Sequence, residues 1–113
     1  MSYNTPPKGG TKILPNFQTN IIAQANAYAI TRPWSSEYEL QLRFKGKFCY
    51  LDGKHCDEEY PFPLGRITYF DNNVWALAFY TFSNQRYEPS IFRSGQWFGS
   101  LEEAISICEL YLV

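Results

Sequence analysis

The sequence has no apolar run near the roughly 20 residues that a membrane-spanning helix requires, so we predict no contact with a membrane. Its first residues are polar and rich in proline and glycine, without the basic stretch and apolar run of a secretory signal. The three cysteines, Cys49, Cys56 and Cys108, are odd in number and irregularly spaced, as is typical of reduced thiols. Together these absences predict a cytoplasmic protein.

The chain also lacks a strongly basic region. Its ten Lys and Arg residues are matched by eleven Asp and Glu residues, which gives a net charge of −1. Only Arg43, Lys45 and Lys47 lie close together. Because nucleic-acid-binding domains usually concentrate positive charge on one face, we predict no nucleic-acid partner.

Motifs for catalysis or cofactor binding are missing as well. The glycines are isolated and suit turns, not a phosphate-binding loop, and no serine stands in a nucleophile-elbow context. The only histidine is His55, which stands beside Cys56 in an acidic segment, Asp52 to Glu59. We therefore predict a protein that is not an enzyme and that holds no cofactor and no metal.

The segment from Asp52 to Glu59 leaves two alternatives open. Side chains of neighbours in an extended loop usually point apart, so His55 is poorly placed to activate Cys56, and a zinc site needs about four ligands. A solvated acidic loop is the favoured interpretation. The alternatives are a small metal-dependent hydrolase that uses this loop, and an immunity or antitoxin-type protein whose acidic loop binds a basic partner.

Aromatic residues are abundant: nine Phe, nine Tyr and three Trp make up 19% of the 113 residues. Aromatic side chains favour strands and large core contacts. A chain of this length suits one domain, and it hides enough surface on folding to need no disulfide or metal. We expect a flexible N-terminal arm over residues 1–15 and a single α+β domain over residues 16–113.

The segment from Asn20 to Ile30 fits two patterns. Ile21, Ile22 and Ala25 fall at helical spacing, whereas its alanines also alternate with polar residues as in a strand. We favour a helix that is capped by Thr19 or Asn20 and ends before Pro33.

An antiparallel meander of about five strands is predicted after residue 37. From Tyr38 onwards, apolar and polar residues alternate with period two, which is typical of a half-buried strand. Asp52-Gly53 predicts a tight turn, and Pro89 predicts an edge or bulge because it cannot donate to a ladder. The predicted strands cover residues 38–45, 48–51, 64–70, 74–82 and 86–92, with a loop over 54–63.

The C-terminal helix has the clearest pattern. Ser100 and Glu103 form a capping box at its start. The residues after it form one apolar stripe, which predicts an amphipathic helix packed on one face of the sheet: Leu101, Ala104, Ile105, Cys108, Tyr111 and Leu112.

The strand over residues 74–82 is apolar on both faces, so both faces need a cover. A helix approaches a sheet most closely over small side chains, and we therefore place the helix over Ala76 and Ala78. Trp75, Leu77 and Phe79 on the opposite face must then be covered by the segment around Asn20 to Ile30 or by a second copy of the chain. We predict a non-enzymatic binding or protein-interaction module that forms a homodimer or binds an unidentified protein. The expected binding residues are Trp75, Phe79, Tyr80 and Trp97.

The region from Leu64 to Leu110 resembles small bacterial proteins that are classed as domains of unknown function. The resemblance implies a bacterial origin but no activity and no functional residues. It is carried by Trp75-Ala76-Leu77-Ala78-Phe79-Tyr80, Ser83, Tyr87-Glu88, Ser94-Gly95, Gly99 and Glu102-Glu103-Ala104.

Overall fold

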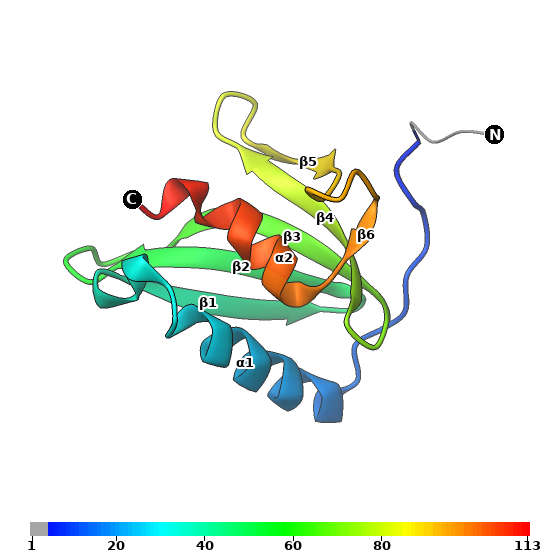
Figure 1. Ribbon diagram of the computed structural model, residues 1–113, viewed down its shortest axis with the longest axis horizontal. Coiled ribbons are helices and arrows are strands. Elements are labelled where there is room, and N and C mark those ends of the chain that lie inside the picture. The colour runs from blue at the N-terminus through cyan, green and yellow to red at the C-terminus, as the bar shows by residue number, and fades with distance from the viewer. Residues whose placement is uncertain (1–4) are drawn as a thin grey trace.

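The computed structural model describes residues 5–113, which form two α-helices and a six-stranded antiparallel sheet (Figure 1). The predicted α+β class is confirmed. In chain order the elements are α1 (Pro15–Ala29), the 3-10 helix η1 (Pro33–Ser36), β1 (Tyr38–Lys45), β2 (Phe48–His55), β3 (Phe62–Asp71), β4 (Val74–Thr81), β5 (Arg86–Ser90), β6 (Phe98–Gly99), α2 (Leu101–Cys108) and the 3-10 helix η2 (Glu109–Tyr111).

The sheet is a meander with the strand order β1-β2-β3-β4-β5. The short strand β6 pairs with Trp75 and Ala76 of β4, on the side of β4 where β5 pairs farther along. β1 is therefore a terminal strand, whereas β4 has neighbours on both sides. Pro89 lies in β5, at the other edge of the meander, as its missing N–H predicts.

Both helices pack on the same face of the sheet and share one core (Figure 1). The core contains Ile21 and Ala25 from α1, and Leu101 and Ile105 from α2. The sheet contributes buried side chains from β1 to β4, among them Trp75, of which 1% is exposed. The C-terminal helix thus covers the sheet as predicted, and the N-terminal helix packs beside it.

The predicted packing of α2 over Ala76 and Ala78 is wrong, because α2 covers the opposite face of β4. The reason lies in the neighbouring strand, where Gly65 has no side chain. A Cβ at Gly65 would lie only 2.8 Å from Sγ of Cys108, so glycine in β3 provides the close approach. The side chains that needed a cover, on Trp75, Leu77 and Phe79, are covered by the chain's own helices.

The predicted start of the first helix and the predicted turn at Asp52-Gly53 are also wrong. α1 begins at Pro15, with Leu14 as its N-cap, because proline suits the first turn of a helix. Asp52-Gly53 is not a turn but lies inside β2. Gly53 is required there by packing, since a Cβ would lie 2.8 Å from Cδ2 of Leu112 and 3.2 Å from Cζ of Phe62.

The predicted capping box of α2 is present. The Ser100 hydroxyl accepts a bond from the Glu103 N–H at 3.1 Å, and the Glu103 carboxylate accepts one from the Ser100 N–H at 2.9 Å. The side-chain oxygen of Asn73 accepts a further bond from the Leu101 N–H at 2.9 Å. The turn between β3 and β4 therefore fixes where the last helix begins.

The predicted N-terminal arm includes Met1 to Asn4, which lie outside the described residues. Its described part contacts the sheet, because the Thr11 N–H donates to the Tyr69 carbonyl at 2.7 Å and the Ile13 N–H donates to the Gly46 carbonyl at 2.9 Å. The Ile13 side chain is buried in the core. Within residues 5–113 no helix has the length and apolar character needed to cross a bilayer.

Candidate functional site

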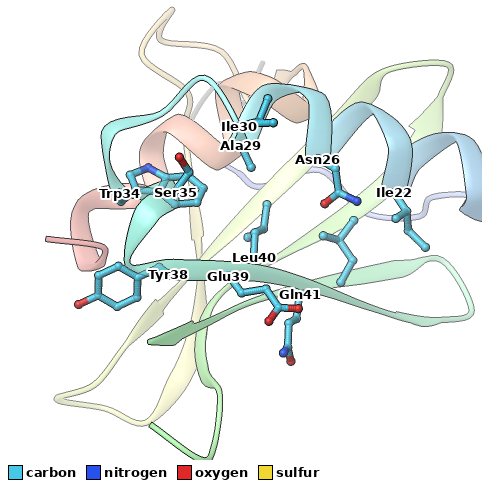
Figure 2. A pocket seen from close by; sticks show the side chains of 11 residues that line it. Ile22, Asn26, Ala29, Ile30, Trp34, Ser35, Tyr38, Glu39, Leu40 and Gln41 are labelled. Atoms are coloured by element: carbon cyan, nitrogen blue, oxygen red, sulfur yellow. The ribbon is translucent and has the colours of Figure 1, made fainter. Parts of the chain in front are cut away.

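A groove of about 570 Å³ lies between α1 and the terminal strand β1 (Figure 2). We call it the edge groove. One wall is the face of α1 that carries Ile22 and Asn26, and the floor is the face of β1 that carries Leu40 and Leu42. The full lining consists of Ile22, Asn26, Ala29, Ile30, Trp34, Ser35, Tyr38, Glu39, Leu40, Gln41 and Leu42.

The alternation of β1 divides its side chains between the groove and the opposite face. Leu40 points up towards α1, whereas Glu39 and Gln41 point down and away from it (Figure 2). Leu40 is buried and Leu42 is half-buried. The apolar half of the strand pattern therefore becomes the floor of a groove that α1 covers only in part.

Within residues 5–113, the main-chain groups on the outer edge of β1 are not paired with another strand. The hairpin from β1 to β2 has a two-residue loop closed by Lys45 opposite Phe48, with φ of +59° at Gly46. In such a hairpin the closing pair is hydrogen-bonded, and the bonded pairs then alternate along the ladder. The N–H and C=O groups of Tyr38, Leu40, Leu42 and Phe44 consequently point away from β2, where no further strand follows in the sheet order.

The α1 wall also exposes apolar surface. Ile22 is 40% exposed and Ile30 is 77% exposed, and both line the groove. An exposed apolar patch beside an unpaired strand edge is a surface that most monomeric proteins avoid or protect. The edge groove therefore offers both apolar contact and main-chain hydrogen bonds to a ligand.

A polar cluster holds η1, which contributes Trp34 and Ser35 to the groove lining. The buried Trp34 donates its Nε1–H to Oε2 of Glu109 at 2.8 Å, and Arg32 forms an ion pair with the same carboxylate at 2.7 Å. Burial alone would raise the pKa of Glu109, but the bonds from Arg32 and Trp34 outweigh it and hold this pKa below its usual value. Since the carboxylate stays charged, η1 remains tied to the C-terminal end of the fold.

The four residues predicted to bind a partner are not brought together. Trp75 lies in the core, and Phe79 stacks on Tyr111 with ring centroids 5.0 Å apart. Tyr80 contacts Tyr87 at 5.0 Å, and Trp97 lies half-buried between β5 and β6. None of these four residues lines the edge groove.

The face of the sheet opposite the helices carries a cluster that the sequence patterns did not single out. The Arg66 guanidinium lies over the rings of Phe48 and Tyr87, at 4.4 Å and 5.6 Å from their centroids. Its Nε is buried and has no hydrogen-bond partner among the described residues. Beside it Arg43 and the buried Asp52 form an ion pair at 2.6 Å. The only advance signal was the alternation that puts these residues on one face.

The acidic segment does not form one site. Asp52 is buried within β2 and paired with Arg43. At the end of β2 and in the loop after it, His55, Cys56 and Asp57 offer ligand atoms within 4.8 Å of one another, so these three residues could hold a metal ion. However, Nδ1 of His55 already accepts the Asp57 N–H at 3.1 Å. Three ligands from consecutive residues fall short of the four that a structural zinc site uses.

The three cysteines should differ sharply towards a thiol reagent such as dithionitrobenzoate. Cys56 is exposed, whereas Cys49 and Cys108 are buried. Burial raises the pKa of Cys108 to about 12 and raises the pKa of Cys49 as well, so both stay protonated. We expect one thiol to react in the folded protein and all three to react in guanidinium. Fast reaction of a second thiol in the folded state would contradict the described burial.

Comparison with known proteins adds no functional information: no family model, no curated protein and no solved structure matches the chain.

Proposed function

We propose that this chain is a non-enzymatic protein-interaction module that binds its partner in the edge groove. The observation that carries the proposal is the unpaired outer edge of β1 beside the exposed apolar wall of α1. Grooves between a helix and an edge strand are a recurring way to bind peptide segments, because main-chain bonds give affinity and alternate side chains give specificity. The cytoplasm is the compartment that we propose for this interaction.

The sequence suggested self-association as a way to cover an apolar sheet face, and this face is already covered within the chain. The homodimer was expected to cover Trp75, Leu77 and Phe79, and these side chains already pack against α1, α2 or η2. The partner that we propose is therefore another protein, and a homodimer would need a different surface.

An affinity capture with a matched pair of variants tests the proposal. Ile22→Glu places a charge on the groove wall. We therefore expect this variant to no longer capture the specific partner from a soluble extract of the source organism. Leu110→Glu makes the same kind of change at an apolar residue that is 68% exposed and lies outside the groove lining. Captured proteins would be quantified by mass spectrometry.

The result expected is a protein that the wild type and Leu110→Glu retain and that Ile22→Glu loses at least ten-fold. Circular dichroism of both variants checks that they fold like the wild type. A folded Ile22→Glu variant that captures the same proteins in the same amounts would contradict the proposal.

A further inference from the structure

We infer that the ligand of the edge groove is an extended segment that adds to β1 as an antiparallel strand and carries an acidic-apolar-any-apolar-basic pattern. The inference rests on the proposed function and names the chemistry of its partner. It is drawn from three features of β1: its outward main-chain groups, its apolar face and its charges.

The main-chain groups set the register of the added strand. Leu40 and Leu42 point their N–H and C=O groups outwards, so a ligand residue opposite each of them exchanges two hydrogen bonds with it. The side chains of these two ligand residues stand on the same face as those of Leu40 and Leu42. They therefore enter the edge groove, whose lining of Ile22, Leu40 and Leu42 selects apolar groups.

The charges set the direction of the added strand. Glu37 directly precedes β1 and Glu39 lies near its start, whereas Arg43 and Lys45 lie at its end. Within the described residues Glu39 and Lys45 form no ion pair with another side chain, and Arg43, although paired with Asp52, keeps 59% of its side chain exposed. Opposite charges on directly facing residues stabilise an antiparallel pair, and like charges destabilise it. A ligand that starts near Lys45 therefore carries its acidic residue first and its basic residue last.

A second copy of the chain does not fit this position, although its own β1 has the same pattern. An antiparallel β1–β1 pair has a two-fold axis perpendicular to the sheet, so both α1 helices would lie in one layer on the same face. Paired strands lie about 4.8 Å apart, whereas packed helices need about 8–10 Å. In Figure 1, α1 projects past β1 at the outer edge of the sheet, where the second α1 would have to lie. A separate segment without a helix avoids this clash.

The chain itself supplies a suitable probe, namely a fluorescent, end-capped peptide with the sequence of residues 37–45. With Gln41 of the peptide opposite Gln41 of β1, the peptide's Glu39 faces Arg43 and its Leu40 faces Leu42. We expect saturable binding to the whole protein by fluorescence anisotropy. A peptide with every charge reversed should bind at least ten-fold more weakly, and 0.5 M salt should reduce this difference because it screens exposed charges.

N-methylation of the peptide tests strand addition directly. A methyl group on the peptide nitrogen of Leu40 or Leu42 blocks a bond to β1, so binding should fall at least ten-fold. The same group on the nitrogen of Gln41 points away from β1 and should leave binding within about two-fold. Ile22→Glu in the protein should weaken binding of the peptide, as it should weaken binding of the natural partner. Leu110→Glu should leave binding of both unchanged.

The outcomes separate this inference from the proposed function. Equal binding of the two charge versions, or equal effects of the three N-methyl groups, overturns the inference. Absence of peptide binding also overturns it, while the proposed function is then still decided by the Ile22-dependent capture. Light scattering that shows a dimer dissociated by the peptide would overturn the choice of a separate partner, since a second copy would then occupy the groove.

Discussion

Replacing Trp75 by alanine should lower the free energy of unfolding by about 3–5 kcal/mol, the usual cost of removing a large buried aromatic side chain. Trp75 is 1% exposed and contacts the Tyr69 ring at 5.1 Å between centroids. It also lies in β4 where β3 pairs on one side and β6 on the other. The cavity would therefore open at the point where the sheet and the helices meet.

Urea unfolding followed by circular dichroism would measure this loss, with Val74→Ala as the control in the same strand. Val74 is 37% exposed, so its truncation should cost less than about 1 kcal/mol. The comparison also decides between two roles of Trp75. A Trp75→Ala protein of unchanged stability that no longer captures its partner would show an interface residue, as the sequence suggested.

Gly99→Ala should be the second severe change, with a loss of about 3 kcal/mol, at the upper end of the range for overpacking. A Cβ at Gly99 would lie 2.4 Å, 2.6 Å and 2.7 Å from three ring carbons of Phe92. Phe92 is itself buried, so its ring has little room to move. The added methyl group would push β6 away from β4 and disturb the start of α2, which follows directly.

Two further variants check this explanation by the same unfolding measurement. Gly95→Ala has no atom within 4 Å of its Cβ and should cost only the roughly 1–2 kcal/mol of a φ of +84°. Phe92→Ala removes the obstructing ring, so Gly99→Ala should cost clearly less in that background than in the wild type. Additive losses in the double variant would contradict a clash between these two residues.

Much of the fold was predictable because local patterns and tertiary packing agree. The capping box at Ser100 and the period-two alternation from Tyr38 depend on neighbours in sequence, and both elements are found where they were predicted. The errors occur where contacts between residues far apart in the sequence determine the local structure. Gly53 looked like a turn residue, but its role is to make room for Leu112, the C-cap residue of η2.

The candidate site was less predictable than the fold. The apolar residues of β1 were expected to be half-buried, but no sequence signal showed that α1 would leave Leu42 and Ile22 beside an open edge. The alanines of β4 suggested the wrong side for α2, because the close approach is set by Gly65 in another strand. Trp75 was predicted to bind a partner because it is a large aromatic residue. Large aromatic residues are equally common in a hydrophobic core, which is where Trp75 lies.

The order of the elements along the chain has a consequence for synthesis on the ribosome. Strands β1 to β5 pair with their neighbours in sequence, so hairpins can form as soon as each pair of strands has emerged. The cover of Trp75 and Leu77 includes α2, which is made after all of the strands. A nascent chain that ends before residue 100 would therefore expose an apolar sheet face until α2 has emerged from the ribosome.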